Sequence, residues 1–546
     1  MKTAARVIVL LLVCSTSALD LAVAQAPNKS KMKEPVWTPT RDAEPIVSAI
    51  NREWAAELKR ADIKPSARCL DSKFLRRAAL DLTGRIPTLP QTITFLDDDS
   101  PDKRRELVDS LLGSRNYSEH LARCWKRLIQ PPDLTSTKSS VDRFTPWLAD
   151  QLAAGRGWND VVRELLTAEV DLTREPRGAF FAANNEMAVP KPSLLAASVG
   201  RVFLGVQIGC AECHNHPFTV WTQEDFWGLA AFFGRTRKVS KGDFTLTEAS
   251  EDGKQWEVTS ITIPEGSGKA SGRVVAARLL GGGEPKSVTD ALRPQLAEWL
   301  TADSNPYFAR AMVNRLWAHC MGRGLVEPLD DQREGNEPTH PELLDLLAKE
   351  FIASGYDVRH LLGCIVLSEP YQVSAQPTRE NSDDRTRHSH HVARAITPDV
   401  LYDSLSIALN PTIVSRAVPG TKPPGKPMKS TSTVQLEPRD SFIRFFGRAS
   451  LDDTGDVFSY GIPQLLRLMN DRELTQQPPF LVDLLKLEPD VPRRIETLFL
   501  IAYSRRPSEA ESHRLRQLIA NDIESPEGYA SILWVLLNST EFVVHD

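Results

Sequence analysis

The chain has 546 residues, of which 41% are hydrophobic and 25% are charged, so collagen-like, low-complexity and wholly disordered chains are excluded. Its 66 basic and 71 acidic residues nearly cancel, and no overall field therefore favours binding to nucleic acid or to an anionic membrane. At about 150 residues per domain, the length suffices for roughly three domains with real hydrophobic cores.

The N-terminus has the pattern of an export signal. Residues 1–24 begin with a short basic segment, continue with an apolar run over 7–13, and end in the small-x-small sequence Ala22-Val23-Ala24. The run is too short for a hydrocarbon core of about 30 Å, and no other stretch approaches about 20 apolar residues. We therefore expect a cleaved signal peptide, a secreted or periplasmic protein and no transmembrane span after cleavage, with a retained N-terminal anchor as the alternative.

The rest of the sequence predicts a mainly α-helical protein, with two helical domains and a small β-rich insertion between them. A Pro- and Lys-rich linker is expected over 25–43, followed by a first helical domain over 44–236. Short alternating runs separated by Gly and Ser predict the β-rich insertion over 237–288. Helical patterns resume over 289–546, and a stretch rich in Pro, Ser and Thr predicts a mobile loop at about 375–440.

Two predicted helices carry side chains that could take part in chemistry. One has Tyr117, Leu121, Cys124 and Leu128 on its apolar stripe, which indicates that Cys124 is a buried and inert thiol. His319 falls off the apolar stripe of a later helix. We therefore expect a surface or capping role for His319, with a ligand or acid–base role as the alternative.

The sequence Cys210-Ala-Glu-Cys213-His214 is the strongest chemical signal, because C-x-x-C-H is the attachment signature of c-type haem. Two thiols about one helical turn apart can each form a thioether with a haem vinyl group, and the adjacent imidazole can bind the iron. A helix expected over 193–206 leads directly to this segment. We predict covalent haem c on Cys210 and Cys213, with His214 as the proximal iron ligand, and electron transfer by such a haem implies a redox partner protein.

Aromatic residues crowd into positions 218–233, directly after this motif. They could line an apolar haem pocket. They also fit an amphipathic helix that begins near Thr222 and turns Phe226, Trp227 and Phe233 toward the core. The two interpretations are compatible.

The cysteine pair has two other interpretations. A structural zinc site would take Cys210 and Cys213 as one pair of ligands, with His216 nearby and a remote residue such as His319 or His340 completing the tetrahedron. A disulfide or redox pair between the two cysteines is the second alternative. Haem, zinc and disulfide all remain open at this point.

A metal-dependent hydrolase is the main alternative to a redox protein. Asp330 and Asp331 form an acidic pair in a predicted loop and His340 follows nearby, a combination that general acid–base hydrolysis can use. In this interpretation zinc is held by the Cys–His segment and the substrate is an extracellular polymer. A non-catalytic surface or assembly protein, whose cysteines only brace a loop, is the third hypothesis. The sequence has no Walker loop, G-x-S-x-G elbow or H-E-x-x-H motif.

Several segments resemble two domains that occur together in one protein family. Those similar to domain of unknown function 1549, also called the planctomycete cytochrome-C type 2 domain, are 74–87, 100–104, 206–218 and 221–233. Those similar to domain of unknown function 1553 are 305–306, 314–319, 322–328, 330–331, 340–344, 502–507 and 537–542. The resemblance covers about 45–235 and 289–543, and it implies an exported protein of a family without an established activity. The cytochrome label agrees with the haem prediction for Cys210, Cys213 and His214.

Overall fold

The structure of the protein is a computed structural model that describes residues 39, 41–129, 138–186, 189–238, 245–248, 260–264, 270–287, 290–413, 433–447 and 461–546. The signal peptide predicted over 1–24 and most of the predicted linker lie outside these residues. Within them, no helix combines the length and the apolar character that crossing a membrane requires.

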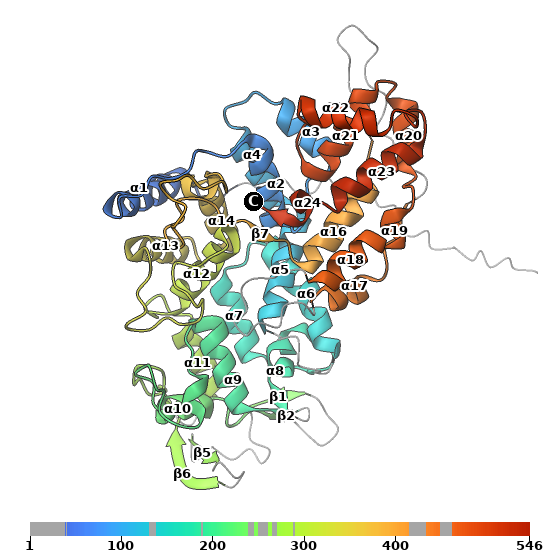
Figure 1. Cartoon of the computed structure of the whole chain (residues 1–546). Helices are drawn as coiled ribbons and strands as arrows, with labels where there is room; N and C mark the ends of the chain where they lie inside the picture. Colours follow the sequence, from blue (N-terminus) through green and yellow to red (C-terminus); the bar gives the residue numbers. More distant parts are fainter. Residues whose placement is uncertain are drawn as a thin grey trace, which may run out of the picture. The chain divides into compact units, whose positions relative to one another are not determined.

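Helices make up most of the described residues, which confirms the predicted mainly α-helical class (Figure 1). The N-terminal helices are α1 (Glu44–Arg60), α2 (Asp71–Thr83), α3 (Leu89–Asp97), α4 (Lys103–Gly113), α5 (Arg115–Ile129), α6 (Lys138–Ala153) and α7 (Trp158–Thr167). Helix α2 contacts both α4 and α5. It ends at Gly84, whose φ of +65° is a left-handed conformation that favours a residue without a side chain.

The middle of the chain leads to the C-x-x-C-H segment. It contains a 3-10 turn (Pro176–Gly178), α8 (Ala179–Ala183), β1 (Asn185–Glu186), β2 (Val189–Pro190), α9 (Pro192–Ser198), a π-helical turn (Val199–Leu204), a 3-10 turn (Gly209–Glu212) and α10 (Gln223–Ala231). The helix expected before the motif is therefore present as α9 and the π-helical turn. The start of α10 is also as predicted, because the side chains of Thr222 and Asp225 form a capping box with the backbone.

The small β-rich insertion is confirmed. Among the described residues it contains β3 (Arg237–Lys238), β4 (Leu246–Thr247), β5 (Ser260–Pro264) and β6 (Ala270–Ala276). Strands β3 and β4 pair antiparallel, and so do β5 and β6, with Ile261 opposite Val275. Both β5 and β6 contact α10, so the insertion is attached to the helix that follows the C-x-x-C-H motif.

The second half of the chain is again helical. Its elements are α11 (Leu292–Leu300), α12 (Phe308–Met321), α13 (Pro341–Ala353), α14 (Val358–Leu367), α15 (Glu369–Gln372), β7 (Arg394–Ala395), α16 (Pro398–Leu409), α17 (Arg439–Gly447), α18 (Ile462–Asn470), α19 (Arg472–Thr475), α20 (Phe480–Leu487), α21 (Val491–Tyr503), α22 (Glu509–Leu518), α23 (Pro526–Leu537), α24 (Thr540–Val543) and β8 (Val544–His545).

The loop expected at about 375–440 differs from the structure over part of its length. Helix α16 lies inside it and buries Val400, Leu401 and Leu405 in a hydrophobic core. This short apolar stripe is enough to anchor a helix, although the surrounding sequence is polar. Residues 414–432 of the predicted loop lie outside the described part of the chain.

Two hydrophobic cores organise the described residues. The first joins the N-terminal helices to α11, α12, α13 and α14, and it extends from Ile50 to Tyr371. The second contains α16 and the C-terminal helices together with Leu80, Ile86 and Leu89. The first core therefore takes side chains from both predicted domains.

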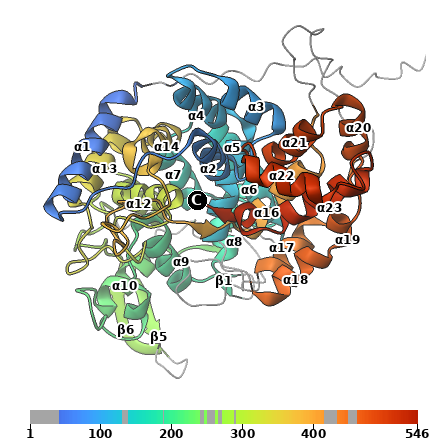
Figure 2. The ribbon, with the colours of Figure 1, turned by 45° about the horizontal axis from the view of Figure 1, so that its top comes forward.

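Helix α2 contributes to both cores and lies beside α24 (Figure 1), and Figure 2 shows it next to the C-terminal end of the chain. Its buried Arg76 donates hydrogen bonds to the carbonyl oxygens of Ala502, at 2.8 Å, and Phe542, at 2.7 Å. These two charge-assisted hydrogen bonds from a buried guanidinium hold the C-terminal helices against the middle of α2.

Candidate functional site

The predicted haem motif lies on the surface, in the loop between the π-helical turn and α10. In this C-x-x-C-H loop (residues 210–214), Cys210, Cys213 and His214 are exposed, and both cysteines are free. The structure therefore contains no disulfide between Cys210 and Cys213.

Hydrogen bonds from α10 hold the backbone of the C-x-x-C-H loop. Trp227 Nε1 donates to the carbonyl oxygen of Glu212 at 2.9 Å, and Gln223 Nε2 donates to that of Cys213 at 3.0 Å. The side chain of His214 is oriented by its neighbour, because Nδ1 lies 2.7 Å from the carbonyl oxygen of Asn215. A carbonyl oxygen only accepts hydrogen bonds, so Nδ1 carries the proton and the Nε2 lone pair of the neutral ring is left for another partner.

A cleft of about 740 Å³ has a wall that begins at Pro217, three residues after His214 in the sequence. It is lined by 217–221, Pro306, Tyr307, Arg310, Val326 and 332–338, so segments from both halves of the chain form its walls. Phe218 is 78% exposed and Val220 is 71% exposed, and these two side chains give the cleft an uncovered apolar wall.

The two halves also contact each other beside the motif. Gln207 Nε2 donates to Asp330 Oδ1 at 2.9 Å, and the backbone nitrogen of Gln332 donates to the carbonyl oxygen of Gly205 at 2.9 Å. The cleft walls are therefore connected through the turn that precedes Cys210.

The aromatic residues after the motif divide between core and cleft. Phe226, Trp227, Phe232 and Phe233 are buried in the first hydrophobic core, as expected for the core-facing side of α10. Phe218 lines the cleft instead, and Trp221 belongs to the core and also borders the cleft. Most of the aromatic crowding therefore serves core packing.

The predicted acid–base residues are not brought together. Asp330 binds Gln207, and both oxygens of Asp331 accept from Arg333 Nε at 3.0 Å. His340 is buried, and burial lowers the pKa of its imidazole to about 4. The carboxylates that act on His340 are those of Glu57 and Asp384 rather than the acidic pair.

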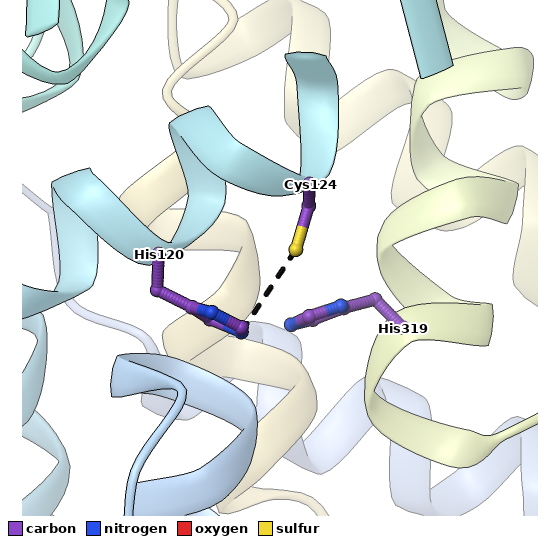
Figure 3. A group of neighbouring side chains, drawn as sticks. All are labelled: His120, Cys124 and His319. Atoms are coloured by element: carbon purple, nitrogen blue, oxygen red, sulfur yellow. Dashed lines mark hydrogen bonds between the residues drawn. The ribbon is translucent and has the colours of Figure 1, made fainter. Parts of the chain in front are cut away.

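His319, the remote ligand of the predicted zinc set, lies in a different group of side chains (Figure 3). His120 and Cys124 are one turn apart on α5, and His319 comes from α12. His120 Nε2 lies 3.9 Å from Cys124 Sγ, and the two imidazole ring centres are 5.6 Å apart. The ligand atoms of these three side chains all lie within 4.8 Å of one another. Among the described residues, no other group of three or more His, Cys, Asp or Glu side chains is as close.

The buried His–Cys group, named for the buried His120 and completed by the partly buried Cys124 and His319, has charged neighbours. Arg127 Nη2 donates to Cys124 Sγ at 3.3 Å, and Arg127 Nη1 donates to Asp399 Oδ2 at 2.8 Å. Burial lowers the pKa of both His120 and His319, so both rings are neutral near pH 7. Burial raises the pKa of the Cys124 thiol.

Sequence reasoning identified Cys124 as an inert thiol and gave His120 no role. The signal that could have linked them is the H-x-x-x-C spacing, which puts both side chains on one face of a helix. The position of His319 beside them follows from the packing of α12 and has no local sequence signal.

The fold and these sites define a mainly helical protein of two domains that meet beside a surface C-x-x-C-H loop. The family described as "Protein of unknown function (DUF1549)" matches residues 49–238, and the family described as "Protein of unknown function (DUF1553)" matches residues 292–519. The chain therefore belongs to the family that combines these two domains, as its motifs predict. No curated protein and no solved structure matches the chain. His120 and Cys124 lie in the first domain and His319 in the second, so both domains build the buried His–Cys group.

Proposed function

We propose that this protein is exported and binds one c-type haem covalently through Cys210 and Cys213, for electron transfer with a redox partner protein. The observation that carries the proposal is the state of the C-x-x-C-H loop, where two free, exposed thiols adjoin an exposed imidazole. The predicted signal peptide over 1–24 supports export. Haem iron, when bound, accepts and donates single electrons.

The donor set of the loop fits a haem. Both thiols are accessible from solvent, as thioether formation with a large planar group requires. The hydrogen bond from His214 Nδ1 to the carbonyl oxygen of Asn215 fixes the tautomer that offers Nε2 to a metal. The role of His214 is to bind the iron, and that of Asn215 is to orient the ring.

The cleft suits an amphipathic ligand. Phe218 and Val220 supply exposed apolar surface, and Arg310 and Arg333, which are paired with Asp345 and Asp331, place guanidinium groups on the same cleft. Haem has an apolar ring and two carboxylates, so one face of the cleft can cover the ring while arginines meet the carboxylates. Covering Phe218 and Val220 would also remove their exposed apolar surface from water.

The test is production of the full chain together with a haem c maturation system, followed by a pyridine haemochrome spectrum of the purified protein. We expect one covalent haem per chain. In the absorption spectrum of the native protein without pyridine, His214→Gln should shift the haem bands by removing the proximal ligand, and His216→Gln, which changes a neighbouring imidazole outside the motif, should leave them unchanged. A colourless protein would refute the proposal, and a colourless protein with zinc on Cys210 and Cys213 would favour the zinc alternative.

A further inference from the structure

We infer that the buried His–Cys group is a second site, separate from the C-x-x-C-H loop, which binds a divalent transition metal ion of borderline softness such as Zn²⁺. Two imidazoles and one thiolate are ligands that Zn²⁺ prefers, and three protein ligands leave one position for water. Figure 3 shows the three side chains pointing toward one another from α5 and α12.

The distances suit a site that closes around an ion. With Zn–N near 2.0–2.1 Å and Zn–S near 2.3 Å, neighbouring ligand atoms in a tetrahedral site are about 3.5 Å apart. In the structure His120 Nε2 and Cys124 Sγ are 3.9 Å apart, and all three ligand atoms lie within 4.8 Å. A contraction on the order of 1 Å, which side-chain rotation can supply, brings them to metal distance.

The His120 ring lacks strong hydrogen bonds in its buried position. Its Nδ1 has no partner, and among the described residues the partner of Nε2 is the sulfur of Cys124, which is a weak one. Because Nδ1 faces the backbone of Gly84, an ion could bind this ring only through Nε2, whose sulfur partner is a weak one. A metal ion bound to Nε2 gives this ring the strong interaction that protein atoms do not supply.

The fold keeps the His120 ring in place. A Cβ built on Gly84 would lie 2.7 Å from His120 Cγ, so the ring packs directly on the backbone at the end of α2. His319 is oriented on the opposite side, where its Nε2 lies 2.7 Å from the carbonyl oxygen of Asp81. Because a carbonyl oxygen only accepts hydrogen bonds, Nε2 carries the proton and Nδ1 is the ring nitrogen whose lone pair is left for an ion.

Charged groups of both signs lie around the three side chains. The carboxylates of Asp399 and Asp81 are buried, and each is paired with an arginine, Asp399 with Arg127 and Asp81 with Arg394. Arg127 contacts Cys124 Sγ and also binds Asp399. The contact with the guanidinium opposes the effect of burial on the thiol and favours the thiolate that a metal requires.

A second His–Cys pair in the molecule provides a matched control. On α14, His360 and Cys364 have the same spacing, and His360 Nε2 lies 3.7 Å from Cys364 Sγ. There the imidazole binds the carboxylate of Glu350 at 2.8 Å, and no second imidazole completes a three-ligand group among the described residues. Cys124→Ser and Cys364→Ser each replace one sulfur atom by oxygen, but only Cys124→Ser should weaken metal binding.

The experiment uses the full chain with Cys210→Ser and Cys213→Ser, so that the C-x-x-C-H loop cannot hold metal or haem. After removal of metal with a chelator, the protein is titrated with Zn²⁺ and bound metal is quantified by elemental analysis. We expect one equivalent of Zn²⁺. Cys124→Ser and His319→Gln should each weaken binding at least tenfold, and Cys364→Ser should leave it unchanged. Absence of stoichiometric Zn²⁺, or equal binding after Cys124→Ser, would overturn the inference.

A spectroscopic measurement keeps the inference testable if a substitution in the group prevents folding. Titration of the Cys210→Ser/Cys213→Ser/Cys364→Ser protein with Co²⁺ should give a thiolate-to-metal charge-transfer absorption, because Cys124 would be a ligand. Co²⁺ that binds without this absorption, or does not bind, would contradict the inference. Neither result depends on whether the C-x-x-C-H loop carries haem.

Discussion

The C-x-x-C-H loop and the buried His–Cys group use the same side-chain types in opposite surroundings. In the loop, Cys210, Cys213 and His214 are close in sequence and exposed to solvent. In the buried group, the ligands come from two helices and two domains, and their ligand atoms lie within 4.8 Å.

The difference separates two kinds of ligand. An exposed pair of thiols can be reached by a large planar molecule, which then buries them. A group whose ligand atoms all lie within 4.8 Å of one another can hold only a small ion. The proposals for haem and for a metal ion follow from these surroundings and can fail independently.

The largest expected effect comes from removing the loop thiols. Cys210→Ser with Cys213→Ser should abolish covalent haem, because no thioether can form. Both residues are exposed, so the free energy of unfolding of the haem-free protein should change by no more than about 0.5 kcal/mol. Haemochrome spectra and urea unfolding measure the two effects. Retention of covalent haem would show that other cysteines are used, and Cys124→Ser, the control, should keep it.

The second-largest effect is expected at Gly84, whose backbone packs against the His120 ring. Gly84→Ala forces a left-handed φ of +65° on alanine and drives its methyl group into the His120 ring. We expect the free energy of unfolding to fall by about 3 kcal/mol, together with loss of bound Zn²⁺. Gly155→Ala is the matched control, because Gly155 has a similar φ of +68° but open space around its Cβ position. It should cost only about 1 kcal/mol, and equal effects at the two glycines would contradict the packing argument.

Buried imidazoles elsewhere should make stability depend on pH. Burial lowers the pKa of His340 to about 4 and that of His388 to about 3, whereas an unfolded imidazole titrates near 6.5. As pH falls below about 6.5 the unfolded chain takes up protons first, so stability is full above that pH and is lost toward pH 4. At pH 5 the loss is about 2 kcal/mol per imidazole. Calorimetry between pH 7 and pH 4 measures it.

Two histidine variants separate this effect from general acid unfolding. His340→Gln should flatten the pH dependence between about 6.5 and 4, because it removes one of the buried titrating groups. His513→Gln, at an exposed position on α22, should leave the slope unchanged. If the free energy of unfolding changed equally with pH in the parent, His340→Gln and His513→Gln proteins, buried imidazoles would not govern stability in acid.

The smallest effect is expected at the cleft. Phe218→Ser removes an exposed apolar side chain, so the free energy of unfolding should change by less than about 0.5 kcal/mol. If the ring covers bound haem, its loss admits water and lowers the reduction potential, because a wetter site favours the more charged iron. Leu70→Ser, which is 74% exposed and outside the cleft lining, should not move the potential. Equal potentials for Phe218→Ser and the parent would place the haem away from the cleft.

The sequence predicted the features that depend on local patterns. The helical class, the small β-rich insertion and the start of α10 at Thr222 follow from periodicity and capping, which act over a few residues. Helix α16 was missed because Val400, Leu401 and Leu405 stand in a stretch whose overall composition is polar.

The buried His–Cys group could not be predicted in full. The spacing of His120 and Cys124 was visible, but a third ligand from α12 depends on how two domains pack around the end of α2. The same limit explains why His340 lies apart from Asp330 and Asp331, since α13 begins beside the Glu57 and Asp384 carboxylates. Proximity in sequence does not determine the contacts of a buried side chain.

The central claim, a covalent haem on the C-x-x-C-H loop, is tested most directly by intact-mass spectrometry of the protein matured in a host that attaches haem c. The account predicts a single species whose mass equals that of residues 25–546 plus one haem, with the haem-bearing peptide containing Cys210 and Cys213. A mature chain with the mass of the polypeptide alone would contradict it.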